Sequence, residues 1–293
     1  ISLGFLNDPG WTVADKVNRI TMNFRNDYQL NDKIGFSFQT VGSVRMQNAP
    51  GSLSRSSDVV SGISSRNFDI NPFNYALNTS RALRAYDSNG EREYYTLNFA
   101  PFNILEELDN NYIKLNVIDL KAQAEFNWQI IKGLTFKTAG TYNTTDSRTD
   151  IFYKTGSKEA YRNGEKPYGR TQMGRDVRWT NFNNLTWKQK VKKHNYDVML
   201  GHEVSFRSTE YLLGEAMDFP FDNLGNDYLG LGATPSKVES SYSEKMLLSF
   251  FARGNYNYDN RYLLTATVRA DGSTVFSLSL IHISEPTRQA EIS

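Results

Sequence analysis

Apolar and polar residues alternate strictly along several long stretches of the chain. Between Ile118 and Ile130 every even-numbered residue is apolar and every odd-numbered residue is polar. A period of two is typical of a β-strand with one apolar face and one wet face. The stretch exceeds the roughly 5–6 residues usual in soluble domains, and it reaches the roughly 9–11 residues that cross an outer membrane. The pattern therefore predicts a transmembrane strand.

The alternation recurs in pairs of segments joined by short polar turns, which predicts four β-hairpins. They pair 19–30 with 33–45, 113–131 with 134–147, 175–190 with 195–207, and 246–258 with 261–271. The turns are built from residue types that suit tight hairpins: Asn31-Asp32, Lys132-Gly133, Lys192 to His194, and Asp259-Asn260. The expected fold class is all-β: an antiparallel transmembrane β-barrel fragment, with about eight strands of a larger barrel.

Long connections alternate with these short turns. We predict long extracellular loops over 46–112, 149–174 and 208–245, with the short turns on the periplasmic side. Aromatic residues gather beside the short turns, as in an interfacial girdle: Tyr28, Trp128, Trp187, Tyr196, Tyr256, Tyr258 and Tyr262. On the polar face, Asp119, Lys121, Glu125 and Arg253 are expected to line a wet interior or to touch a plug.

Composition excludes several classes of protein. The 293 residues include 33 basic and 32 acidic side chains, so nothing favours a nucleic-acid partner. No run of 18 apolar residues exists, which excludes a transmembrane helix. Cysteine is absent, which excludes a disulfide framework and thiolate metal sites in this chain.

No catalytic, cofactor or metal site is expected. The three histidines, His194, His202 and His282, suggest no catalytic triad. The glycine-rich stretch 230–237 lacks the spacing of a phosphate loop. An oxygen-rich stretch could hold Ca²⁺, but its spacing matches no EF-hand and its residues are common turn formers: Asp218, Asp222, Asn223, Asn226 and Asp227.

The loops do carry side chains suited to binding. Aromatic faces can stack on sugar rings, and planar polar groups can bond their hydroxyls, so ten loop residues are predicted to contact substrate or partner: Phe73, Tyr75, Arg81, Arg84, Tyr86, Asp87, Phe219, Phe221, Asp222 and Tyr228. The alternative is that these side chains pack the loops against each other or against a partner protein.

The end of the chain breaks the pattern abruptly. Residues 278–293 back-translate to DNA that resembles a transposase adapter used in short-read sequencing. We therefore predict that 278–293 is not native and that 1–277 is part of the barrel. Because 1–5 does not resemble a signal peptide, the chain is expected to be an internal piece of a longer protein.

Three motifs suggest a family. The sequence RADGSTVF at 269–276, which follows the strand 260–268, resembles the strand-and-loop signature of SusC/RagA-type TonB-dependent outer-membrane transporters. The segments 71–81 and 186–203 are similar to other motifs of that family. Two residues depart from the pattern, because Ala270 and Val275 stand where the family often carries arginine. These departures bear on the subfamily rather than on the family.

The resemblance implies more than the residues themselves show. It implies a barrel of 22 strands around an N-terminal plug, in the outer membrane of a Gram-negative bacterium, in contact with outer-membrane lipid. Import of oligosaccharides or peptides would be driven by the TonB complex and assisted by a SusD-like surface lipoprotein. The alternatives are a TonB-dependent receptor for siderophores or another nutrient, a passive porin, or a soluble β-rich glycan-binding or adhesive protein.

Overall fold

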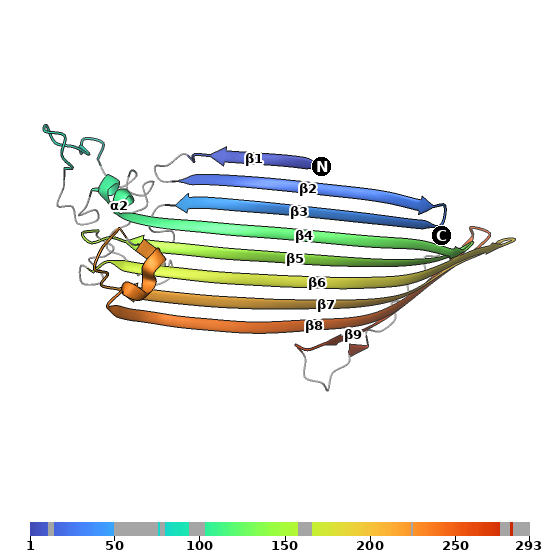
Figure 1. The fold of residues 1–293 in the computed structure, drawn as a ribbon. Helices are drawn as coiled ribbons and strands as arrows, with labels where there is room; N and C mark the ends of the chain where they lie inside the picture. The colour runs from blue at the N-terminus through green and yellow to red at the C-terminus, as the bar shows by residue number, and fades with distance from the viewer. Residues whose placement is uncertain are drawn as a thin grey trace.

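A single antiparallel sheet forms the body of the protein. The computed structural model describes residues 1–10, 15–49, 76, 80–93, 103–157, 166–223 and 225–275, together with the backbone of 282–283. Ten strands lie in the sheet in chain order, and each pairs with the next (Figure 1). The predicted all-β antiparallel architecture is therefore confirmed. Within the described ranges, no helix has the length and apolar character needed to cross a membrane.

Most of the strands are long, and two short helices accompany them in the part of the chain that the structure describes. The strands are β1 (Ser2–Asp8), β2 (Lys16–Asn31), β3 (Ile34–Ala49), β4 (Asn111–Ile131), β5 (Leu134–Tyr153), β6 (Tyr168–Val191), β7 (His194–Met217), β8 (Thr234–Tyr258), β9 (Tyr262–Ser273) and β10 (His282–Ile283). The helices are α2 (Ile104–Asn110) and the 3₁₀ helix η1 (Gly225–Leu231). All four predicted hairpins are present; β1 and β10 are additional to the eight strands expected.

Three predicted turns differ by one residue from the turns in the structure; in the third hairpin His194 already belongs to β7, so the turn is Lys192-Lys193. The first hairpin turns at Asp32-Lys33 because the side-chain oxygen of Asn31 accepts hydrogen bonds from the backbone N–H groups of Lys33 and Ile34, both at 2.9 Å. In the fourth hairpin, Asp259 and Asn260 both have positive φ angles, 53° and 55°, and β9 begins only at Tyr262.

The predicted loops were too long. β5 continues to Tyr153 and β6 begins at Tyr168, so their connection is 154–167 rather than 149–174. β7 continues to Met217 and β8 begins at Thr234, which shortens the third loop to 218–233. The predicted non-native tail lies outside the described residues except for the backbone of β10, so it stays a prediction.

The register places the apolar residues of neighbouring strands on one face, where they form a band. The band covers eleven residues, or ten residue steps, from Ile118 to Trp128 in β4 and from Phe206 to Tyr196 in β7. Ten residue steps of strand are about 33 Å long, or about 25 Å along the membrane normal if the strand is tilted by about 40°. That height matches the lipid-facing band of an outer-membrane barrel.

The band also reports the tilt of the strands. Trp128 marks the turn-side end of the band in β4, and its row of paired residues runs through Phe136 and Leu185 to Leu200 in β7. In β7 the band does not end at Leu200 but continues four residues closer to the turn, to Tyr196. A shift of four residues is about 13 Å, and three strand spacings are about 14 Å. If the band is parallel to the membrane plane, this shift means that the strands are tilted by about 40° from the membrane normal. Closure of a barrel requires a tilt in this range.

The opposite face is polar, and many of its charged side chains lie in ion pairs. Asp119, Lys121, Glu125 and Arg253 lie on this face, as predicted. Its ion pairs join opposite charges: Arg25 with Asp27 (2.8 Å), Lys137 with Glu125 (2.7 Å), Lys188 with Asp197 (3.4 Å), Arg207 with Asp176 (2.7 Å) and Arg269 with Asp271 (2.8 Å).

One aromatic pair interrupts the polar face. The rings of Phe182 and Phe251 stack with their centroids 5.6 Å apart, across Gly201 on the strand between them. The guanidinium of Arg269 lies 5.9 Å from the centroid of the Phe251 ring. A glycine bridged by an aromatic ring from the next strand is a recognised way to cover the exposed backbone of a sheet.

Candidate substrate and partner site at the loop rim

The β7–β8 loop folds over the apolar-face side of the sheet, beyond the band. Phe219 is only 6% exposed and packs edge-on against the fully buried Phe152, with ring centroids 5.4 Å apart. Tyr112 stacks on the same Phe152 ring at 5.9 Å. Gly169 leaves room for this packing, because a Cβ there would lie 2.9 Å from the Phe219 ring. Burial raises the pKa of the Tyr112 phenol, which lies beyond the band and stays neutral.

Polar contacts hold the same loop to the β5–β6 end of the sheet. The side-chain amide of Asn226 donates hydrogen bonds to the carbonyl oxygens of Ile151 (3.0 Å) and Arg170 (2.6 Å). The carboxylate of Asp222 accepts from both the backbone N–H (3.1 Å) and the hydroxyl (3.0 Å) of Thr155. The two loops are thus tied together as one unit.

Replacing Asn226 with alanine is expected to loosen this loop without unfolding the sheet. The substitution removes two hydrogen bonds from a buried side chain and should lower the free energy of local opening by about 1–3 kcal/mol. Hydrogen exchange of residues 218–233 should accelerate accordingly. Asn223→Ala is the matched control, because Asn223 is exposed in the same loop. Equal exchange rates in the two variants would contradict the assigned role of Asn226.

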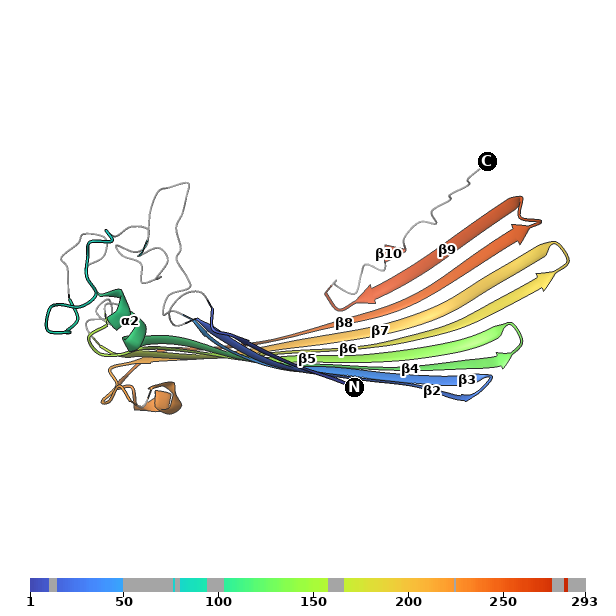
Figure 2. The same ribbon diagram turned by 90° about the horizontal axis from the view of Figure 1, so that it is seen from above.

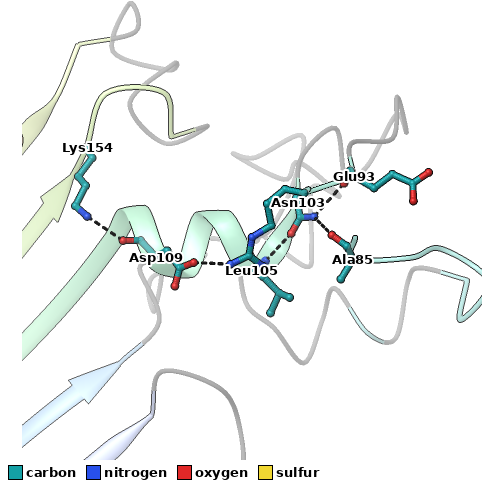
Figure 3. A network of polar contacts seen from close by, with 7 residues as sticks. Ala85, Glu93, Asn103, Leu105, Asp109 and Lys154 are labelled. Carbon is teal, nitrogen blue, oxygen red and sulfur yellow. Dashed lines mark hydrogen bonds and ion pairs between the residues drawn. The ribbon is translucent and has the colours of Figure 1, made fainter. Parts of the chain in front are cut away.

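A second network organises the described part of the β3–β4 loop (Figure 3). Asn103 caps α2 by accepting from the Leu105 N–H (3.0 Å), while its amide donates to the carbonyl oxygens of Ala85 (2.9 Å) and Glu93 (3.0 Å). Tyr86 and Arg92 form a backbone bridge, and the Arg92 guanidinium lies 4.9 Å from the centroid of the Tyr86 ring. A small folded hairpin therefore rests against the start of α2.

The helix α2 links this hairpin to the neighbouring loop. Arg92 pairs with the Asp109 carboxylate at 2.6 Å, and the Asp109 carbonyl oxygen accepts from Lys154 Nζ at 3.1 Å. Lys154 precedes Thr155, which is bonded to Asp222 of the third loop. The described parts of all three long loops are therefore connected by polar contacts.

The structure divides the predicted contact residues into two groups. Figure 2 shows α2 and the segment 80–93 on one side of the sheet and η1 on the other. Because the η1 loop packs on the apolar face, the segment 80–93 lies on the polar-face side. The predicted Arg81, Arg84, Tyr86 and Asp87 are in the first group; Phe219, Phe221, Asp222 and Tyr228 are in the second.

Not all of these side chains are free to bind. Phe219 is buried in loop packing, and the Asp222 carboxylate accepts a hydrogen bond from the Thr155 hydroxyl, so both side chains contact other parts of the loops. The Asp87 carboxylate accepts from the N–H groups of Asn89 (2.8 Å) and Glu91 (2.9 Å) and shapes its own turn. Three predicted aromatic residues are well exposed: Tyr86 (47%), Phe221 (64%) and Tyr228 (58%). The predicted Phe73 and Tyr75 lie outside the described residues.

Sequence reasoning missed the residues that connect the loops. Arg92, Asp109, Lys154 and Thr155 lie in stretches with no periodic pattern, and their contacts join residues far apart in the chain. The Asn103 cap was the one readable signal, since an asparagine just before a helical segment with acidic residues in its first turn is a typical N-terminus. In the described part of the chain, no group of three or more His, Cys, Asp or Glu side chains could hold a metal ion.

Comparison with known proteins adds independent evidence. No family model matches the chain. The TonB-dependent receptor P39 of Formosa agariphila is 24% identical over 296 aligned positions, which cover 98% of this chain and 26% of the receptor. The TonB-dependent receptor P26 of the same bacterium is 35% identical over 101 residues, 34% of this chain and 10% of that receptor.

A solved structure shares the fold. The RagAB peptide importer in its open-open state superposes with a TM-score of 0.72 at 19% sequence identity, over 91% of this chain and 28% of that chain. The chain thus spans about a quarter, or less, of the length of the proteins it matches.

A sheet with an eleven-residue apolar band, strongly tilted strands, short turns at one end and linked loops at the other is a segment of an outer-membrane β-barrel wall. The apolar face is the outward, lipid-facing side, and the polar face lines the lumen. This fold and the similar receptors confirm the resemblance to SusC/RagA-type TonB-dependent transporters that the motifs indicated. The relatives of this chain are receptors rather than enzymes.

Proposed function

We propose that the protein containing this chain imports oligosaccharides or peptides through the outer membrane, with energy supplied by the TonB complex and with a SusD-like surface lipoprotein at the rim. The described segment would contribute part of the lumen wall and part of the docking rim. The name of the RagAB structure, a peptide importer with the same fold, supports peptides as one candidate substrate.

The pairing of charges on the lumen wall is the observation that carries this proposal. Five cations of this face lie within 3.4 Å of a carboxylate, so charges of both signs are interspersed along the wall. Such a surface offers many hydrogen-bonding groups but little net field. It suits large neutral or zwitterionic solutes, such as oligosaccharides and peptides, better than strongly charged ones.

The side of the wall on which each loop lies selects among the predicted contact residues. The hairpin with Tyr86 and Arg84 lies on the lumen side, where an entering substrate or a capping lipoprotein would meet it. The helix η1, which includes Tyr228, lies on the outward side of the wall, away from that path (Figure 2), and Phe221 belongs to the same loop, which packs on the apolar face through Phe219. Among the predicted residues, we therefore assign substrate or lipoprotein contact to the lumen-side group.

Uptake by the full-length transporter, expressed with its lipoprotein, tests the proposal. Labelled oligosaccharides and oligopeptides should be imported only when TonB is present. Tyr86→Ala should weaken binding or uptake about fivefold, because an aromatic contact contributes about 1 kcal/mol. Tyr228→Ala, at a similarly exposed tyrosine on the outward side, should leave uptake unchanged. Uptake without TonB, or uptake of ferric siderophores alone, would overturn the proposal.

A further inference from the structure

Three cations lie on the outward face of the wall, just above the apolar band, and form what we call the cation row. The register places Lys114 on β4, Arg148 on β5 and Arg175 on β6 on the same face as Ile118, where the band begins in β4. Lys114 lies four residues beyond Ile118, which is about 13 Å of strand, or about 10 Å along the membrane normal at a tilt of about 40°. This is the height of lipid headgroups rather than of acyl chains.

The cation row follows the edge of the band. Arg148 pairs with Asn116, and Arg175 pairs with Asp146, so each step to the next strand moves the row two residues toward the short turns. The edge of the band moves in the same direction, by four residues from β4 to β7. The three cations therefore lie at nearly the same height above the hydrocarbon layer, as charges aligned with a membrane surface would.

The terminal nitrogens of both arginines remain available for a ligand. Nε of Arg148 donates to Asp150 Oδ2 at 2.9 Å, and Nε of Arg175 lies 3.4 Å from Asp146 Oδ1. Among the described residues, the Nη groups of these arginines have no hydrogen-bond partner, and Lys114 has no ion-pair partner. A guanidinium fork matches two oxygens of one phosphate group.

A groove of about 580 Å³ opens on the outward face at the cation row. Both arginines line it, and so do three exposed apolar side chains: Ile118 (52%), Met173 (43%) and Leu212 (50%). Met173 and Leu212 are paired across β6 and β7, so apolar surface reaches above the band and lies among the charged groups. A concave apolar surface of this size with a few convergent polar groups is typical of a ligand site.

The β7–β8 loop covers the wall higher up. Leu229 of this loop packs over Gly214, where a Cβ would lie 2.9 Å from Leu229 Cδ2. Gly214 lies eight residues beyond Phe206, the end of the band in β7, which is about 26 Å of strand, or about 20 Å along the membrane normal. The groove and the cation row lie below this loop and above the acyl chains, where a molecule with acyl chains, phosphates and sugars would fit.

We propose that this part of the wall binds the phosphorylated glycolipid of the outer leaflet, lipopolysaccharide. Its glucosamine phosphates contact the cation row, and the upper parts of its acyl chains lie on the apolar side chains of the groove. The exposed carboxylates beside the row, Asp146 and Glu210, accept hydrogen bonds from sugar hydroxyls and weaken the field that would hold a free anion. Recognition therefore requires the phosphates, sugars and acyl chains of one molecule together.

Lipid A titrated onto the full-length transporter in mild detergent, with the bound lipid counted by native mass spectrometry, tests this inference. Lys114→Gln combined with Arg175→Gln should raise the dissociation constant at least about tenfold, because two charged contacts with phosphate are lost. Lys121→Gln combined with Arg178→Gln is the matched control, since it removes the same charges from one row of the lumen face. Lipid A without its phosphates should bind the wild-type protein about tenfold more weakly than lipid A itself.

Arg148→Lys is a second variant, which keeps a cation beside the buried Asp150. It should weaken binding about threefold, because an ammonium group lacks the planar fork. Folding of each variant is checked by the resistance of the barrel to heat on denaturing gels. Equal dissociation constants for the outward double variant and its lumen control would overturn the proposal, since lipid would then cover this face without being recognised. Displacement of lipid A by millimolar inorganic phosphate would also overturn it and would indicate a site for free anions instead.

Discussion

Phe38→Arg is expected to destabilise the folded barrel by at least about 2–4 kcal/mol. Phe38 lies near the middle of the apolar band of β3, between Ile34 and Val44, and its ring contacts Phe24 at a centroid distance of 6.1 Å. A guanidinium placed at the bilayer midplane on the lipid face costs about 2–4 kcal/mol, and the aromatic contact is lost as well. Few other single substitutions in this wall should have so large an effect.

The control is Ser37→Arg, which places the same arginine one residue away but on the lumen-facing side of the strand. Ser37 faces the lumen, and its cross-strand partners are Asp27 and Glu125, so an added cation there meets two carboxylates. Its effect should stay within about 1 kcal/mol. Denaturant titration of the full-length protein folded into lipid vesicles gives both values. If Phe38→Arg is as stable as Ser37→Arg, the assignment of the lipid-facing side is wrong.

Gly201→Ala is expected to destabilise the lumen wall by about 1–3 kcal/mol through overpacking. An alanine Cβ at this position would lie 2.0 Å from Cε2 of Phe251, which is far inside contact distance. The Phe251 ring would have to leave its stack with Phe182 and its place beside Arg269. A single methyl group on β7 would therefore disturb side chains on three other strands, β6, β8 and β9.

Two further variants show whether the ring is the cause. Gly254→Ala should be neutral, because a Cβ there meets no heavy atom within 4 Å. In a Phe251→Ala background, adding Gly201→Ala should cost little, so the two substitutions should be strongly non-additive. Additive effects in denaturant titrations would mean that Gly201 is required for a reason unrelated to the ring.

The membrane-crossing part of the fold could be predicted from sequence because the lipid imposes the pattern. From Ile118 to Trp128 one face must be apolar and the other wet, and the alternation is correspondingly strict. Beyond Phe206 in β7 both faces of the strand meet water or other loops, and the segment 234–245 of β8 is polar on both faces. No period of two remains there, so the sequence pattern predicts loops where β7 and β8 in fact continue.

The site could be predicted only in its residue types. Phe219 and Phe221 lie two positions apart in the same short stretch, yet one is buried and the other is 64% exposed. The difference arises because the loop folds back onto Phe152, a contact with a residue far away in the chain. The separation of Tyr86 from Tyr228 depends in the same way on the direction in which each loop folds, which carries no local signal.

The strands extend beyond the apolar band, and the height of this extension sets a minimum tether length for any lipid-anchored protein that binds at the rim. β7 continues for eleven positions from Phe206 to Met217, which is about 36 Å of strand, or about 28 Å above the hydrocarbon layer at a tilt of about 40°. A lipid-anchored protein seated on the rim needs a tether that covers this height. An extended chain spans about 3.3 Å per residue, so the tether needs at least about nine residues between its acyl anchor and its folded domain.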